Sequence, residues 1–139
     1  MIINEDLSHR VELKRRMESE TPNEFYENLP HGFSAVEAPR PGQDCVVYAT
    51  DIRNKRLFAD DLFAMYDIVP EGQERPGDLV VYTNIMGDLR HAAVYRGDGK
   101  VVSKWGGNGP VLEHPIDHVP SFWGEVITFL RKPHPAEEK

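Results

Sequence analysis

The sequence predicts an α+β fold, in which helices from the first half of the chain pack on an antiparallel sheet formed by the second half. Apolar residues recur at helical spacing before Pro70, and after Pro76 their period drops toward two. A third observation is the Gly97-Asp98-Gly99 segment between two such runs, which is typical of a β-hairpin. With 139 residues and 40% hydrophobic content, the chain can bury one core. We therefore predict a single domain over residues 1–139.

The N-terminal part of the chain favours short helices. Residues 5–19 carry a few apolar side chains at near-helical spacing among many charges, which predicts an amphipathic surface helix. Thr21 and Pro22 form an N-cap and first-turn pair, so PNEFYENL is a second candidate helix. Residues 1–30 are thus predicted to form a helical flank.

The middle of the chain begins with residues 30–43, which hold so many Pro and Gly residues that we expect an extended loop. Asp44 is a good N-capping residue, and the apolar pattern after it predicts a helix that starts at Cys45. The two valines after Cys45 would also suit a strand. Residues 58–69 favour a further helix, which Pro70 ends.

The second half of the chain reads as a compact antiparallel sheet of about five strands, because the period-two pattern is interrupted by turns at short intervals. The predicted strands are 78–83, 91–96, 100–105, 110–114 and 125–132. Residues 134–139 are polar, and we expect them to form a disordered tail.

Charge and composition exclude several classes of function. A formal charge of −7 and a pI near 5.3 argue against a nucleic-acid partner, which needs clustered Lys and Arg. The N-terminus is charged throughout, unlike a signal peptide, and no apolar run approaches the roughly 20 residues that span a bilayer. We therefore expect a soluble cytoplasmic protein with no membrane partner. A single cysteine allows no internal disulfide, so Cys45 either packs in the core or does chemistry.

The position of Cys45 suits a nucleophile. A thiol at a helix N-terminus can have a lowered pKa, because the unpaired backbone N–H groups and the helix dipole stabilise the thiolate. An imidazole within hydrogen-bonding reach would complete the activation, and a polar partner on its other nitrogen would fix its orientation. His91 opens a predicted strand and is the candidate base. The sequence thus predicts a thiol hydrolase with Cys45 and His91 as its catalytic pair.

The register of the predicted hairpin decides the third catalytic residue. A three-residue loop places Ser103 diagonal to His91 on one face, whereas a two-residue loop places Lys104 there. A lysine would disfavour a protonated imidazole, so Ser103 is preferred. His114 on the following strand is a third possibility.

The segments DCVVYATD, RPGDLVVY and HAAVYRGDGKVVS resemble the NlpC-type branch of the papain-like cysteine peptidases. That family has a cysteine at a helix start, a Gly-Asp-Leu-Val strand, and a histidine that opens a hairpin, with a third polar residue about twelve positions later. Ser103 stands at that distance from His91. The C-terminal segment also resembles small, poorly characterised bacterial and phage-borne domains near these peptidases. The resemblance covers roughly residues 43–133, which it implies form a papain-like core.

The resemblance implies hydrolysis of an amide or isopeptide bond through an acyl-thioenzyme intermediate, without metal or organic cofactor. The substrate would be a peptide, a peptidoglycan fragment or a protein. The backbone N–H of Cys45 is the default oxyanion donor, and Gln43 is a candidate second donor because it is close in sequence. Trp105 lies on the predicted face of Ser103 and could line a substrate groove. Substrate specificity is expected in loops such as 30–43 and 84–90.

Two other functions stay open. The family usually has Asp-Cys-Ser-Gly where this chain has Asp-Cys-Val-Val, and Ser is an uncommon third residue, so a catalytically inactive domain that binds a protein or peptide stays open as an alternative. An acyltransferase would share the thioester intermediate. The His, Asp and Glu residues within 113–118 suit a metal ion, but Pro115 interrupts regular structure between them, and we expect no metal.

Overall fold

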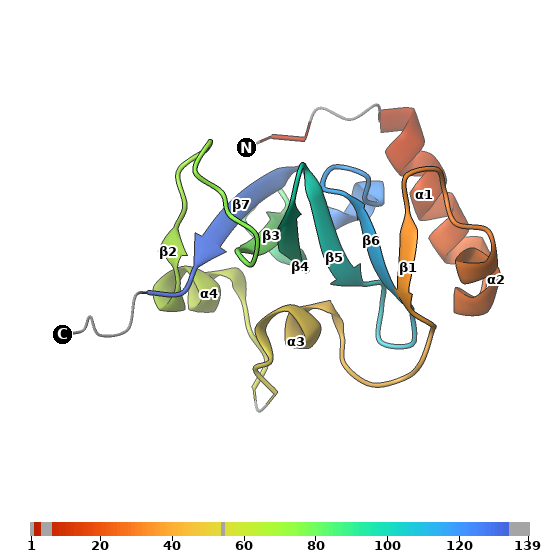
Figure 1. Ribbon diagram of the computed structural model, residues 1–139, viewed down its shortest axis with the longest axis horizontal. Helices are drawn as coiled ribbons and strands as arrows, with labels where there is room; N and C mark the ends of the chain where they lie inside the picture. The colour runs from red at the N-terminus through yellow and green to blue at the C-terminus, as the bar shows by residue number, and fades with distance from the viewer. Residues whose placement is uncertain (1, 4–6, 54, 134–139) are drawn as a thin grey trace.

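The computed structural model describes residues 2–3, 7–53 and 55–133 and shows one antiparallel sheet with helices packed against it (Figure 1). The seven strands lie in the order β1-β6-β5-β4-β3-β7-β2. Their bounds are β1 (Ser34–Glu37), β2 (Asp67–Ile68), β3 (Leu79–Thr83), β4 (Leu89–Gly97), β5 (Lys100–Lys104), β6 (Val111–Pro115) and β7 (Val126–Arg131). The helices are α1 (Leu7–Ser19), α2 (Pro22–Glu27), α3 (Cys45–Thr50), α4 (Ala59–Met65) and the 3-10 turn η1 (Ser121–Trp123). The predicted α+β class is confirmed, and the predicted tail 134–139 lies outside the described residues.

The sheet has seven strands, so the prediction of about five was too low. The five predicted strands correspond to β3 to β7, while β1 and β2 are short edge strands. β1 lies within the predicted loop 30–43 and pairs with β6, and β2 follows α4 and pairs with β7. Strands of four and two residues are too short to show a period in the sequence. They pair here because β6 and β7 would otherwise present unpaired backbone groups at the sheet edges.

The two faces of the sheet carry different clusters. Because side chains alternate along a strand, the pairs Val80–Ala93 and Tyr82–His91 share one face, together with the core residues Trp105 and Trp123. We call this the tryptophan face. The intervening pairs of β3 and β4, among them Val81–Ala92, lie on the other face, where α3 and α4 pack. We call this the α3 face. Figure 1 shows α1 and α2 together on one side of the molecule and α3 and α4 on another.

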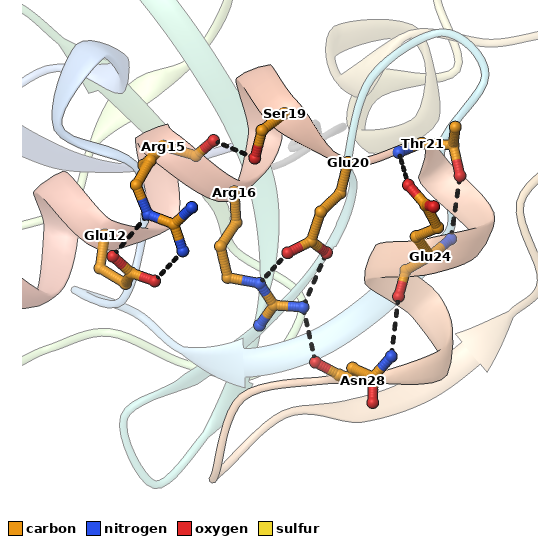
Figure 2. A network of polar contacts seen from close by, with 8 residues as sticks. All are labelled: Glu12, Arg15, Arg16, Ser19, Glu20, Thr21, Glu24 and Asn28. Carbon is orange, nitrogen blue, oxygen red and sulfur yellow. Dashed lines mark hydrogen bonds and ion pairs between the residues drawn. The ribbon is translucent and has the colours of Figure 1, made fainter.

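The N-terminal helices are tied to each other and to the tryptophan face. Leu13 of α1 and Phe25 of α2 belong to its core cluster. Thr21 caps α2 through a reciprocal capping box with Glu24, as the sequence predicts. Arg16 of α1 bonds Glu20 and the backbone of the segment after α2, so the two helices form one polar network (Figure 2).

α3 begins at Cys45, as predicted, because the Asp44 carboxylate accepts a hydrogen bond from the backbone N–H of Val47 at 2.9 Å. Val46 and Ala49 of this helix pack on the α3 face of the sheet. Over the described residues, none of the helices combines the length and the apolar character that crossing a membrane requires.

Candidate functional site

The Cys45 thiol lies between the first turn of α3 and β4. The thiol forms a hydrogen bond with the backbone of Ala92. The side chain of Ala92 belongs to the cluster of the α3 face. Burial raises the pKa of the thiol to about 11, and the nearby Asp44 carboxylate acts in the same direction. The Ala92 hydrogen bond opposes this shift but is weaker than burial. The expected lowering of the Cys45 pKa is therefore not found, because desolvation outweighs the polar groups at the start of a six-residue helix.

His91 lies in the core of the tryptophan face, with 1% of its surface exposed. Its ring stacks on the indole of Trp123, with ring centroids 3.8 Å apart and an interplanar angle of 16°. Nε2 is buried, and no hydrogen-bond partner for it exists among the described residues. Burial, with a smaller contribution from His114, holds the pKa of His91 well below its ordinary value, so the imidazole is neutral at physiological pH.

The structure does not bring Cys45 and His91 together. His91 and Ala92 are neighbours on β4, so their side chains point to opposite faces of the sheet. Cys45 lies beside Ala92 on the α3 face, whereas His91 stacks on Trp123 on the tryptophan face. The catalytic roles of both residues stay predictions, and the geometry does not supply the hydrogen bond that a Cys–His pair requires.

Ser103 shares the tryptophan face with His91, because Tyr95 pairs with Val101. The predicted three-residue loop is wrong, since Gly97 pairs with Lys100 across a two-residue loop, and an irregularity between Tyr95 and Gly97 restores the register that places Ser103 on this face. The Ser103 hydroxyl nevertheless bonds another histidine, His114 on β6, with 2.9 Å between Oγ and Nε2. The other ring nitrogen of His114, Nδ1, donates to the backbone carbonyl of Pro115 at 2.8 Å. Because a neutral imidazole carries one N–H, Nε2 accepts the hydrogen bond from the Ser103 hydroxyl. Both side chains are fully buried. Burial lowers the pKa of His114 to about 4.

Lys104, the alternative to Ser103 as the third catalytic residue, lies on the α3 face, where it links two loops. Its ammonium donates to the backbone carbonyls of Arg40, Gly106, Gly107 and Gly109 at 2.9–3.3 Å. Burial lowers its pKa, although four carbonyl acceptors favour the charged form. This side chain therefore holds the loop that leads to α3 against the glycine-rich loop after β5.

The two residues predicted to contact substrate lie in different places. Gln43 is half-buried beside the start of α3, and its side-chain amide is oriented with the oxygen toward Arg53, 2.7 Å from the nearer guanidinium nitrogen. The Gln43 N–H₂ group then points away from Arg53. Trp105 is 3% exposed and packs against Phe25 and Trp123, so it is a core residue rather than the wall of an open groove.

A groove that the sequence does not single out runs along the α3 side of the molecule. It consists of a hollow of about 610 Å³ and an adjoining one of about 210 Å³, which share Arg56, Leu57, Leu89 and Arg90. We call it the Arg56–Arg90 groove. Its smaller part reaches Asp44 and Val46, which flank Cys45 in the sequence. The expectation that the loop 84–90 shapes a binding region was the one signal that pointed to it.

Comparisons with known proteins add little to this geometry. No family model matches the sequence, and no curated protein does. Among solved structures, the chain is similar to the P60 domain of an antigen from M. avium subspecies paratuberculosis, at 22% identity and a TM-score of 0.44. The match covers 89% of this chain and 95% of that one. Within residues 2–3, 7–53 and 55–133, no group of three or more His, Cys, Asp or Glu side chains is arranged to hold a metal ion.

Proposed function

We propose that this protein is a catalytically silent, NlpC-type papain-like domain that binds a peptide segment of another protein. The observation that carries the proposal is the position of His91, which stacks on Trp123 while Cys45 lies beside Ala92 on the other face of the sheet. A cysteine hydrolase needs an imidazole within hydrogen-bonding reach of its thiol. The arrangement found here supports a domain that keeps the sequence pattern without the catalytic pair.

The protonation states support the same proposal. With a pKa of about 11, only roughly one Cys45 thiol in ten thousand is ionised at neutral pH. The thiolate is the nucleophilic form, so the attacking species is scarce. The His91 imidazole is neutral and could accept a proton, but it faces the core cluster of Trp123 and Tyr82 instead of the thiol.

The binding role is supported by the Arg56–Arg90 groove. It is open to solvent and is bordered by the start of α3, the segment before α4 and the loop between β3 and β4. Loops on a rigid sheet are the usual carriers of recognition. The sequence resemblance to peptidases whose substrates are peptides is consistent with a retained peptide groove.

Acylation by p-nitrophenyl acetate tests the proposal, because an activated cysteine forms an acetyl thioester that intact mass spectrometry detects. We expect the wild-type protein and the Cys45→Ala variant to show the same small amount of acetylation and the same rate of nitrophenol release. A rapid acetyl adduct on Cys45 that is lost in His91→Ala would overturn the proposal. The folded state of each variant is checked by circular dichroism, because His91 is part of the core.

The thiol hydrolase remains the second candidate function. It is favoured by one specific observation: Cys45 is the first residue of α3 and follows the capping carboxylate of Asp44, which is the position expected for a nucleophile at a helix start. The same experiment decides between the two candidates. An acetyl adduct that is lost in Cys45→Ala but persists in His91→Ala would assign the hydrolase with a base other than His91.

A further inference from the structure

Asn108 is the one asparagine in the sequence that a glycine follows. An asparagine side chain is thermolabile, because the backbone nitrogen of the next residue attacks its carbonyl carbon. Glycine hinders this attack least, since it has no Cβ and the greatest backbone freedom. Asn108 is exposed in the loop between β5 and β6, and over the described residues no hydrogen bond holds its side-chain amide. The Asn108–Gly109 pair is therefore chemically labile.

The fold requires a glycine at position 109 for a steric reason. A Cβ added to Gly109 would overlap the backbone carbonyl of Trp105. The loop is this tight because the Trp105 backbone N–H donates to the Pro110 carbonyl at 2.9 Å and closes the loop at its base. Any other residue at position 109 would force the two ends of the loop apart. The labile pair is thus built into the geometry of the glycine-rich loop, residues 105–110.

Hydrogen bonds restrain the nitrogen that would attack. The Gly109 backbone N–H donates to the Gly106 carbonyl at 3.1 Å. The Lys104 ammonium donates to the Gly106 and Gly109 carbonyls at 2.9 Å each, so it holds both partners of that hydrogen bond in place. Attack requires the Gly109 nitrogen to leave Gly106 and turn toward the Asn108 side chain. The loop must therefore open before the labile pair can react.

From these contacts we infer that Asn108 is a site of spontaneous deamidation, and that the Lys104 ammonium slows the reaction by keeping the loop closed. The Gly109 nitrogen loses its proton to water and bonds to the Asn108 Cγ atom, while the side-chain nitrogen takes up a proton and leaves as ammonia. Water then opens the resulting succinimide ring at either carbonyl, which gives aspartate or isoaspartate. The net reaction is hydrolysis of the side-chain amide. The inference does not depend on the proposed function.

Isoaspartate changes the length of the main chain. The chain then runs through the Cβ and Cγ atoms of residue 108, which inserts one extra carbon before Gly109. This displaces the Gly109 carbonyl from the Lys104 ammonium, which also holds the Arg40 carbonyl at 3.1 Å in the loop that leads to α3. Aspartate, by contrast, leaves the main chain as it was. Isoaspartate at position 108 should therefore loosen the link between the two loops, and aspartate should not.

Deamidation rates in the folded and the denatured chain test the inference without any variant. Wild-type protein is incubated at mildly alkaline pH, once in buffer and once in guanidinium chloride, and the products are mapped by mass spectrometry. In the denatured chain, Asn108 should convert faster than Asn28, which a leucine follows. In the folded chain, Asn108 should still convert first but about tenfold or more slowly, because only the open loop reacts. Equal rates in the two states, earlier conversion of another asparagine, or no conversion of folded Asn108 over the full incubation would overturn the inference.

Lys104→Met tests the restraint. Removing the ammonium should let Asn108 in the folded protein convert faster than in the wild type by about tenfold or more. The matched control Lys100→Met should keep the wild-type rate, since Lys100 is exposed at the other end of β5. Leu62→Ala weakens the core of the α3 face without touching the loop, so it shows what a loss of overall stability does to the rate. Equal rates in Lys104→Met and the wild type, or the same acceleration in Leu62→Ala, would contradict the role of Lys104.

Stability measurements separate the effect of isoaspartate from that of a new charge. The isoaspartate form of the aged protein, isolated by chromatography, should unfold at a lower urea concentration than the wild type. Asn108→Asp is the matched control, because it adds the same carboxylate without lengthening the main chain, and it should be as stable as the wild type. Equal stability of the isoaspartate form and Asn108→Asp would contradict the assigned loss of the Lys104 contact with Gly109.

Discussion

The His91 imidazole stacks on the Trp123 indole, with ring centroids 3.8 Å apart and planes 16° from parallel. This contact fixes the ring in the core of the tryptophan face, next to Tyr82 at 5.3 Å. A buried neutral imidazole packed between aromatic rings contributes to stability as an aromatic side chain does. We therefore assign His91 a packing role, and its replacement should be read out first in the stability of the fold.

The first prediction concerns the acid stability of the fold. Burial holds the pKa values of His91 and His114 below their ordinary value in the folded state, and both rings bind protons near pH 6.5 when the chain unfolds. The unfolded state therefore binds more protons, and the free energy of unfolding falls as the pH drops below about 6.5. For His114 the loss ends near its folded pKa of about 4. Urea unfolding at a series of pH values measures this decrease.

His91→Phe separates the contribution of His91 from that of His114. Phenylalanine keeps a flat ring against Trp123 and removes one titrating group, so this variant should lose less stability between pH 6.5 and pH 4 than the wild type. His31→Phe is the matched control, because His31 is exposed, and its pH profile should equal that of the wild type. A His91→Phe profile with the wild-type slope would show that His91 does not titrate as a buried group.

The second prediction concerns the capping of α3. Asp44→Ala removes the side-chain acceptor of the Val47 N–H and should lower the free energy of unfolding by about 1 kcal/mol. Asp44→Ser keeps an acceptor at the N-cap and should lose less. Thermal unfolding monitored by circular dichroism gives both values. Equal loss in the two variants would show that the carboxylate acts through its charge and not through the cap.

The third prediction concerns Lys104. Lys104→Met removes the donor shared by four backbone carbonyls and should destabilise the fold by about 2 kcal/mol or more. Lys100→Met is the matched control, since Lys100 is exposed at the other end of β5 and should tolerate the change. Urea unfolding measures both variants. Equal stability of Lys104→Met and the wild type would mean that the two loops do not depend on this ammonium.

Much of the fold could be predicted from local sequence signals. The Thr21-Pro22 pair marks the start of α2 and Asp44 marks the start of α3, because capping depends on a few adjacent residues. Apolar residues that alternate with a period of two predict β3 to β7, since each of these strands has at least one buried face. β1 and β2 escaped prediction because they form only where a neighbouring strand offers unpaired backbone groups.

The candidate site was less predictable than the fold. The sequence places Cys45 at a helix start and His91 in a strand, but it does not say which face of that strand the helix covers. His91 and Ala92 are adjacent, so a shift of one residue decides whether the imidazole or a methyl group faces the thiol. The same limit applies to Ser103, whose partner His114 lies across the β5–β6 pairing. The Arg56–Arg90 groove joins segments distant in sequence and gives no continuous motif.

The reaction of Cys45 with iodoacetamide shows whether the thiol is activated. We expect a rate constant below that of a free thiol at neutral pH, which rises with pH without levelling off below about pH 10, because the pKa of the thiol is about 11. His91→Phe should leave this rate unchanged. A wild-type rate above that of the free thiol, with a plateau near neutral pH that His91→Phe abolishes, would instead establish Cys45 and His91 as a catalytic pair.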